Sequence, residues 1–424
     1  MLNLIRNHPL MKVLNKNRGN PRILILMEPL WGIPFNLIAP FVTIYMSVQG
    51  ITDVQIGVIL SIAMIVQVVF SFFGGIITDK LGRKFTTMIG DFFGWSFACL
   101  IWAISNNFWL FLIAVIFNSI EQVNATAWFC LLIEDADEKD LVEIYTLAHI
   151  GGLVAVFFAP LAGFMIDGFS LVPVVRVLYL VFAINMLIKV FLTYRYCDET
   201  RQGKIRIKET KSVPIRQLIY EYKELIPKII RSKALMQVVI ISVIFRITLL
   251  INTTFFGLYI TQNLGIPERY LAFFPILNAI VMLVFMVGLQ HKLDSVKFRL
   301  PMWGGLVLFI IGHIMLILMP AGYLVLIALY VFLIAVANAL VEPRRGALLQ
   351  LHLDVEERAR INALIITFVT AFTMPFGYLT GVLSSLSRRF PFILALILFI
   401  LAFIIVGRIK DPEVKDDQVL ANDA

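Results

Sequence analysis

Residues 74–84 read GGIITDKLGRK, a short apolar run that ends in a cluster of charged residues. Asp79, Arg83 and Lys84 fall within six residues, and Gly82 lies among them. Long apolar segments flank this stretch on both sides. Such a short reversal favours a glycine, because glycine adopts backbone conformations that other residues avoid. The stretch therefore predicts a tight, charged turn between two apolar helices.

The composition places these apolar segments in a membrane. The chain has 424 residues, of which 60% are hydrophobic and 15% charged, whereas roughly a quarter of the residues in soluble domains are charged. A helix needs about 20 apolar residues to cross roughly 30 Å of hydrocarbon, where it satisfies its own backbone hydrogen bonds. We therefore predict an all-α membrane protein that has the lipid bilayer as a partner.

Apolar runs of that length recur along the whole chain. Twelve spans are predicted, at 23–47, 54–78, 85–105, 108–132, 143–166, 172–196, 236–260, 269–290, 300–319, 322–345, 360–384 and 391–409. No signal-peptide pattern precedes the first span, so we expect it to remain as a helix. The predicted organisation is two six-helix halves, 23–196 and 236–409, joined by a cytoplasmic linker at 197–235 and flanked by tails at 1–22 and 410–424. Within the linker, 215–230 is expected to form an amphipathic surface helix.

Positive charge differs strongly between the two sides of the predicted membrane. Of the 36 Lys and Arg residues, the outer loops and the outer ends of the spans hold Arg176, Arg269, Arg388 and Arg389, and nearly all the others lie in the tails and inner loops. Because positive charge marks the cytoplasmic side, both termini are predicted to be cytoplasmic, in the cell (inner) membrane of a bacterium. The net charge of +8 follows from this distribution and does not indicate nucleic-acid binding.

The two predicted halves share landmarks. Pro160 in the fifth span has a counterpart in Pro375 in the eleventh, and a polar stretch precedes each of these spans. Transporters built from such parallel repeats hold their substrate between the halves near the middle of the membrane.

In this setting the charged turn resembles the loop between the second and third helices of the major facilitator superfamily. The resemblance rests on Gly75, Asp79, Gly82, Arg83 and Lys84. It implies twelve transmembrane helices in two pseudo-repeated halves, and a gating loop in which Asp79 and Arg83 exchange partners as the inner gate opens. The alternative is a loop that only anchors the topology. The counterpart of the turn at 291–299 lacks the glycine, so any latch should be asymmetric.

Three ionisable side chains lie deep in predicted spans: Glu28 in the first, Glu121 in the fourth and Arg246 in the seventh. An ionisable group near the bilayer centre is costly, so such groups usually face the protein interior and form pairs. Glu121 and Arg246 lie at a similar depth, counted at about 1.5 Å per residue. We predict substrate or proton binding for all three, with structural ion pairs between helices as the alternative. Asp91 in the third span is expected to make a structural contact.

Polar and aromatic neighbours extend these positions into stripes along the helices. The resemblance places the first, fourth, seventh and tenth helices around a central cavity. The predicted binding residues in three of these spans are Glu28, Trp31, Asn36, Asn118, Glu121, Asn124, Arg246 and Asn252.

The tenth span has two interpretations. Overlaying the halves adds Asn338 and Glu342 to the binding residues and places Arg344 and Arg345 at the inner mouth of the cavity. Hydropathy alone ends the span near Val341, which leaves these charged residues at a solvated helix end.

The expected function is secondary active transport of a small organic solute by a monomer, with the proton gradient as the energy source and no cofactor or metal. A partial antiporter pattern at Gly151, Gly152, Pro160 and Gly163 and the cavity acids favour proton antiport and efflux. Arg246 favours instead the uptake of an anionic nutrient with protons, and a lipid flippase would have the same architecture. No phosphate-binding loop, HExxH helix or catalytic triad is present, so no enzyme activity is expected.

Overall fold

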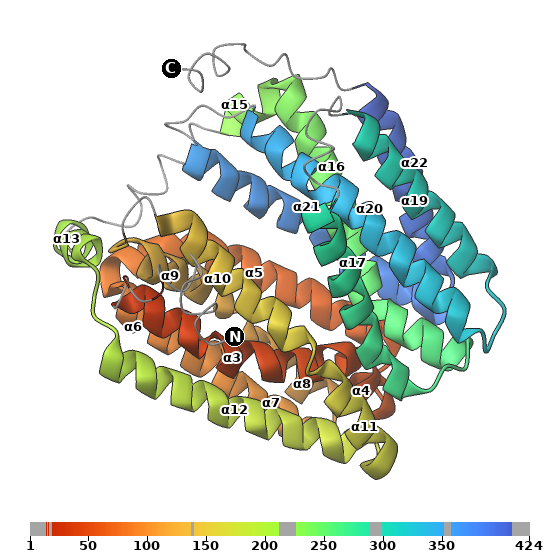
Figure 1. Cartoon of the computed structure of the whole chain (residues 1–424), viewed down its shortest axis with the longest axis horizontal. Helices are drawn as coiled ribbons and strands as arrows, with labels where there is room; N and C mark the ends of the chain where they lie inside the picture. The colour runs from red at the N-terminus through yellow and green to blue at the C-terminus, as the bar shows by residue number, and fades with distance from the viewer. Residues whose placement is uncertain are drawn as a thin grey trace.

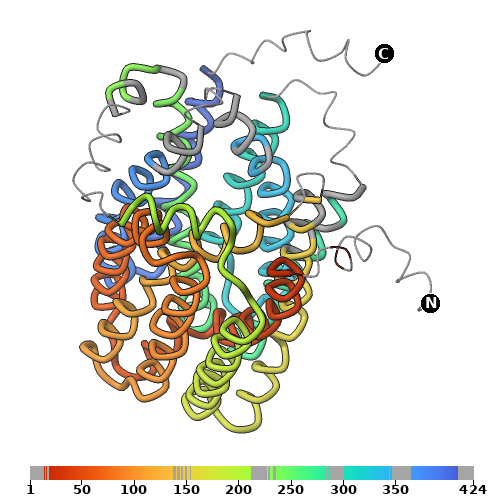
Figure 2. Tube along the Cα trace, turned by 90° about the vertical axis from the view of Figure 1, so that its left-hand side faces the viewer, coloured from red at the N-terminus to blue at the C-terminus, as the bar shows by residue number. Residues whose placement is uncertain are grey.

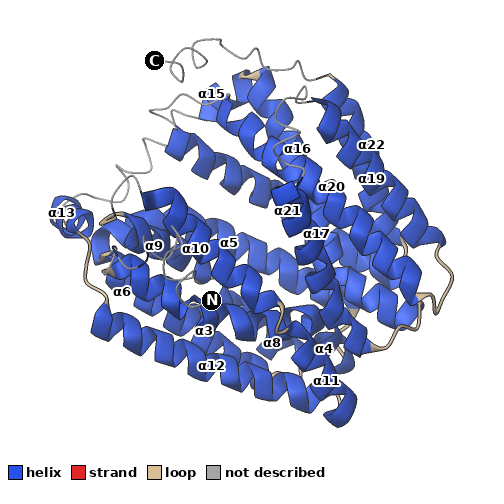
Figure 3. Ribbon diagram, in the orientation of Figure 1, coloured by secondary structure: helices blue, strands red, loops and turns tan. Residues whose placement is uncertain are grey.

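Helices form the regular secondary structure of the described part of the chain, without strands (Figure 3). The computed structural model describes residues 14, 16, 19–136, 140–211, 226–288, 299–351 and 358–408. Cys99, Cys130 and Cys197 are free thiols, as their wide spacing predicts. The all-α prediction is confirmed.

The first half of the chain supplies six spans, several of them interrupted. They are α3 (Asn20–Ile38) with η1 (Ala39–Phe41) and α4 (Val42–Val48); α5 (Asp53–Leu81); α6 (Arg83–Gly90) with the π-helix η2 (Asp91–Phe97) and α7 (Ala98–Ile104); α8 (Phe108–Asn118) with α9 (Glu121–Ile133); α10 (Leu141–Val156) with α11 (Ala159–Phe169); and α12 (Leu171–Tyr196). Prolines lie at two of the breaks, because a proline in the first turn of a helix loses no backbone hydrogen bond. Pro40 belongs to the 3₁₀ turn η1, and Pro160 lies in the first turn of α11, directly after the break in the fifth span.

The second half follows two short helices, α13 (Arg201–Thr210) and α15 (Ile226–Arg231). Its elements are α16 (Lys233–Leu258) with the π-helix η4 (Tyr259–Asn263), the 3₁₀ helix η5 (Glu268–Phe273), α17 (Phe274–Gly288), α19 (Arg299–Leu318), α20 (Leu324–Leu351), α21 (Arg358–Leu386) and α22 (Phe390–Gly407). Within the described ranges, eleven helices are long and apolar enough to cross a membrane. The remaining predicted span, 269–290, corresponds to η5 and α17.

The structure bears on two boundary predictions, the end of the tenth span and the surface helix in the linker. Helix α20 continues without a break to Leu351, whereas the part of it found long and apolar enough to cross a membrane runs from Leu324 to Glu342. The end near Val341 that hydropathy favours therefore agrees with the span, and the helix itself extends beyond it. Of the surface helix expected at 215–230, only the part from Ile226 belongs to a described element, α15, and the residues before it lie outside the described part of the chain. The 291–298 segment likewise lies outside it.

The helices up to α12 and those from α16 onward form two groups side by side (Figures 1 and 2). We call the end of the molecule with the turn at Gly82 and with α13 the inner end, and the opposite end, with the 49–52 and 387–389 turns, the outer end. That the inner end faces the cytoplasm remains a prediction.

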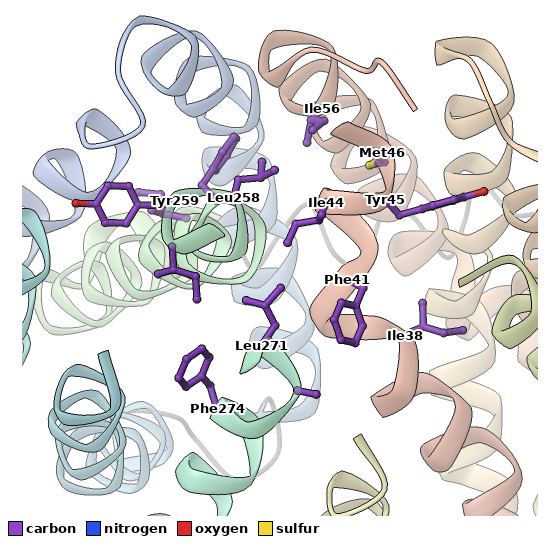
Figure 4. Close-up of a cluster of buried hydrophobic side chains, with 14 of the residues drawn as sticks. Ile38, Phe41, Ile44, Tyr45, Met46, Ile56, Leu258, Tyr259, Leu271 and Phe274 are labelled. Atoms are coloured by element: carbon purple, nitrogen blue, oxygen red, sulfur yellow. The ribbon is translucent and has the colours of Figure 1, made fainter. Parts of the chain in front are cut away.

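Apolar side chains join the two groups at the outer end (Figure 4). Phe41 and Ile44 come from the first group, and Leu258 and Leu271 come from the second. All four side chains are buried. A cluster of this kind excludes water, so it closes the outer end between the groups.

Polar contacts surround this cluster. The carboxylate of Asp53 accepts a hydrogen bond from Ser384 at 2.5 Å and pairs with Arg388 at 2.7 Å, so that the start of α5 is tied to the end of α21. Asp167 of α11 pairs with Arg269 of η5 at 2.9 Å. Both ion pairs link one group to the other.

Helices α5 and α21 cross closely in their outer halves because glycines meet there. A Cβ atom on Gly57 would lie 2.5 Å from the carbonyl oxygen of Gly377 and 3.0 Å from the Cα of Gly381. Next to this crossing, the Ser61 hydroxyl donates to the Met374 carbonyl and accepts from the Tyr378 N–H, each at 2.8 Å. The two backbones therefore approach at a distance that leaves no room for a side chain.

Candidate functional site

A cavity of about 550 Å³ lies between the two groups, on the inner side of the outer contacts. Its walls come from α5, α9, α16, α20 and α21. The polar lining residues are Gln67, Ser71, Glu121, Gln122, Ser242, Arg246, Arg345, Thr367 and Thr370. The outer end is thus closed between the groups, and the cavity lies on the inner side of that closure.

Glu121 and Arg246 both reach this cavity, one from each group of helices. The Gln122 side chain donates a hydrogen bond to Glu121 Oε1 at 3.3 Å. Arg246 is exposed to the cavity, and among the described residues it makes no hydrogen bond or ion pair. The charges of Glu121 and Arg246 attract each other without direct contact. The structure thus brings together the acid and the base that the sequence placed at one depth.

The inner part of α20 contributes Arg345 to the cavity. Its Nε and Nη2 atoms donate to Glu342 Oε2 at 3.2 and 2.7 Å. Arg344 points elsewhere, because it is buried and donates to the Leu340 carbonyl of its own helix. Asn338 is half-buried two turns before Arg345, on the same face of α20.

Several cavity residues were missing from the sequence prediction. Gln67 and Ser71 stand one turn apart on α5, and Thr367 and Thr370 stand one turn apart on α21. Pairs of polar residues at this spacing within long apolar spans were the available signal. The prediction overlooked them because it considered only the first, fourth, seventh and tenth helices.

The amides predicted beside Glu121 contact the third span. Asn118 donates to the Gly94 carbonyl at 2.8 Å, and Asn124 donates to Asp91 Oδ1 at 2.7 Å. Asp91 also forms an ion pair with Lys189 of α12 at 3.2 Å. In this conformation both amides tie the fourth span to η2, and neither belongs to the lining of the cavity described above.

The buried ion pair of Asp91 and Lys189 lies inside the first group of helices. Their side chains are 1% and 5% exposed. Glu28 interacts electrostatically with both and packs against Gly151 of α10, where an added Cβ would lie 3.4 Å from its Cβ and Cγ. Glu28 therefore belongs to a charged cluster within this group, and its predicted role in substrate or proton binding remains a prediction.

The other predicted residues mostly contact helices of their own half. Trp31 stacks on Phe35 with ring centroids 4.9 Å apart and meets the edge of Trp95. Asn36 donates to the Gly32 carbonyl one turn earlier. Asn252 accepts a hydrogen bond from the Tyr330 hydroxyl at 2.7 Å, which links α16 to α20.

The turn after α5 is held by charged groups at the inner end. Arg83 is buried and pairs with Asp79 at 3.0 Å and with Glu134, at the end of α9, also at 3.0 Å. Asp79 is also paired with Arg206 of α13 at 2.8 Å. These hydrogen bonds with Asp79 raise the pKa of Arg206 above its ordinary value, so its guanidinium stays charged. The described partners of the turn thus come from the first group and α13, and the predicted latch between the halves remains a prediction.

Glu199 caps the helix that follows the turn. Its two carboxylate oxygens accept hydrogen bonds from the N–H groups of Arg83 and Lys84, each at 3.0 Å. A carboxylate at this position stabilises the positive end of α6. Lys84 itself donates to the Tyr194 carbonyl at 2.9 Å. Gly75 is exposed, with open space around the position of a Cβ.

Gly82 has a backbone conformation that glycine alone adopts readily, with φ 90° and ψ 159°. The predicted role of this glycine in a tight reversal is confirmed. We expect Gly82→Ala to destabilise the fold by about 1–3 kcal/mol, because the conformation becomes strained and the new methyl group collides with Glu199. Thermal unfolding in detergent measures the loss. Gly75→Ala is the matched control, and equal unfolding temperatures for the two variants would contradict this prediction.

Comparison with known proteins agrees with this architecture. The family model of the Major Facilitator Superfamily matches residues 30–371 of the chain. Over 126 residues the chain is 30% identical to YqjV of Bacillus subtilis (strain 168), an uncharacterized MFS-type transporter. That alignment covers 29% of this chain and 30% of the length of that relative.

Solved structures of transporters share the fold. The nucleoside transporter NupG aligns with a TM-score of 0.69 at 14% identity, covering 92% of this chain and 100% of that one. A POT family transporter in complex with 5-aminolevulinic acid aligns with a TM-score of 0.69 at 11% identity, covering 91% and 94%. The xylose transporter XylE from E. coli, in an inward-open conformation, aligns with a TM-score of 0.63 at 16% identity, covering 95% and 98%. At these identities the likeness shows the fold alone.

Proposed function

Since the chain belongs to the major facilitator superfamily, we propose that it moves a small organic solute across the membrane by alternating access and couples this movement to protons. The observation that carries the proposal is the cavity between the two groups of helices. Glu121 of α9 and Arg246 of α16 both line it, one from each group.

The proposed alternating access of the cavity to the two sides of the membrane follows from where the two groups of helices are in contact. Contacts at the outer end close that side, while the inner halves of α5 and α21 line the cavity. A relative rotation that separates the outer contacts and brings the inner halves together would expose the same cavity residues to the other side. Rigid-body rocking of repeats around a fixed central site is the general mechanism of such folds.

Glu121 is the proposed proton-binding residue. A carboxylate that shares a cavity with a cation is stabilised in its charged form when the cation is near and loses this stabilisation when the cation withdraws. Glu121 and Arg246 belong to different groups, so a rotation of the groups changes their separation. This change supplies a physical link between proton binding and the conformational cycle.

The direction of coupling has two candidates. Competition of proton and solute for Glu121 gives antiport, which the partial pattern on the fifth span favours. Arg246 and Arg345 in the same cavity favour symport, in which an anionic solute and a proton are bound together.

The test uses protein reconstituted into proteoliposomes with imposed pH and sodium gradients of each direction and a panel of small solutes. We expect Glu121→Gln to abolish accumulation driven by the pH gradient, because glutamine has a similar shape but binds no proton. Exchange of solute without a gradient should persist, since alternating access itself is intact.

Glu268→Gln is the matched control, because this acid lies in η5 at the outer end, away from the cavity. It should behave as the unmodified protein does. Full pH-driven accumulation by the Glu121→Gln variant would contradict the role of Glu121, and accumulation driven only by sodium would contradict proton coupling.

A further inference from the structure

Two arginines and one acid line the cavity, and a second acid, Glu342, pairs with one of the arginines. Among the described lining residues, Arg246 and Arg345 are cationic and Glu121 is the acid. Arg345 and Arg246 are close enough to repel each other electrostatically. Two guanidinium groups therefore share a site in the membrane region, where a charge without a partner is costly, and of the two Arg246 has no ion-pair partner among the described residues.

Arg246 is the better placed of the two for a ligand. It lies at mid-depth on α16, faces the cavity and has no hydrogen-bond or ion-pair partner among the described residues. A guanidinium presents five N–H donors in a planar fork that matches the two oxygens of a carboxylate or phosphate. Among the described residues none of these donors has a hydrogen-bond acceptor, and the side chain lines the cavity.

Arg345 is held in place but retains donors. Its Nε and Nη2 both bond to Glu342, which fixes the orientation of the side chain. Phe245 lies under the guanidinium, 5.6 Å from the ring centroid to Cζ. Nη1 makes no hydrogen bond to the described residues and remains free for a second oxygen of the same ligand.

The rest of the lining is suited to uncharged polar groups. Gln67, Ser71, Gln122 and Thr370 add hydrogen-bond donors and acceptors to the same cavity as Glu121. A volume of about 550 Å³ is in the range of pockets that hold small molecules.

We propose that the transported solute is a small organic anion, whose carboxylate or phosphate binds between Arg246 and Arg345 and whose polar remainder binds near Glu121. The inference rests on the proposed function, since it names the substrate class of the same cavity. A cationic solute is disfavoured, because it would meet two arginines in this site.

The test measures binding to the full-length protein in detergent, where no gradient is present. The probes are matched sets that differ in charge: gluconate, glucose and glucosamine; benzoate, benzamide and benzylamine; glycerol 3-phosphate and glycerol. The readout is the rise in unfolding temperature at equal ligand concentration, followed by titration. We expect stabilisation by anionic members only, and the gluconate and glycerol 3-phosphate arms separate carboxylate from phosphate recognition.

Arg246→Gln should weaken binding of the stabilising anion by about ten-fold or more, the usual effect of losing a charge-assisted hydrogen bond. Arg246→Lys should restore part of it, because the charge returns without the fork. Arg269→Gln, which removes an exposed arginine at the outer end, should leave the affinity unchanged.

Stabilisation by the amines or amides, equal anion affinity in Arg246→Gln, or no response to any anionic probe would each overturn the inference. Anion binding without pH-driven transport would instead overturn proton coupling and leave the inference standing. Proton-coupled transport of a neutral or cationic solute would do the reverse, so the two proposals fail in distinguishable ways.

Discussion

Gly57→Val should abolish transport while leaving a folded protein in the membrane. The outer halves of α5 and α21 meet backbone to backbone, and even a Cβ on Gly57 would lie 2.5 Å from the Gly377 carbonyl oxygen. Rigid backbone atoms cannot move aside as a flexible side chain can, and overpacking of this kind is destabilising. The variant cannot reach the closed outer end of this structure, so it should be held with that end open.

The measurement combines solute exchange in proteoliposomes with distances between spin labels at Asn106 and Tyr323, which lie in outer turns of the two different groups. We expect exchange at background level and a longer distance than in the parent protein. Gly304→Val is the matched control, because Gly304 lies within α19 and nothing is within 4 Å of an added Cβ. Normal exchange by the Gly57→Val variant would show that the outer crossing is not needed for turnover.

Asp91→Asn should destabilise the protein by about 3–5 kcal/mol, the usual cost of breaking a buried ion pair from one side. The substitution keeps the shape of the side chain but leaves the ammonium of Lys189, 5% exposed, without its counter-charge. Thermal unfolding in detergent, with the fraction of folded protein followed by size-exclusion chromatography, measures the loss.

A double variant, Asp91→Asn with Lys189→Met, should recover part of the lost stability, since the ammonium is removed together with its counter-charge, while Glu28 loses the attraction of Lys189. Asp167→Asn is the control, because it breaks an ion pair whose side chains are 54% and 40% exposed. Exposed pairs contribute about 0–1 kcal/mol, so this change should be small. A single Asp91→Asn variant as stable as the parent would show that the ion pair contributes little.

Hydropathy and charge predicted the helices well because both act on whole segments. The tight turn at Gly82 was predictable because this glycine lies between two long apolar runs. Its positive φ in the structure agrees with that prediction. Hydropathy alone could not show that Arg345 lines the cavity, because a charged helix end and a charged cavity wall have the same composition.

The rotation of each helix about its axis was harder to predict. A polar stripe shows which residues share a face, but it does not show which neighbour that face contacts. Asn118 and Asn124 share the stripe of Glu121 yet bind the π-helix η2, while only Glu121 reaches the cavity described here. The partner of Lys189 was equally hidden, because a pairing between the third and sixth spans leaves no trace in local sequence spacing.

The hydrogen bonds of Ser61 affect the free energy that is needed to separate α5 from α21 during the transport cycle. Its hydroxyl sits between the Met374 carbonyl and the Tyr378 N–H, which are positions i and i+4 of one helix beside Pro375. These two groups are natural hydrogen-bond partners of each other in an α-helix. When α5 withdraws, α21 can close that bond itself, and the Ser61 hydroxyl can turn to its own helix as buried serines do. This interhelical link can therefore be broken without leaving a polar group in the membrane unpaired. The link stabilises the closed outer end, yet breaking it costs little free energy.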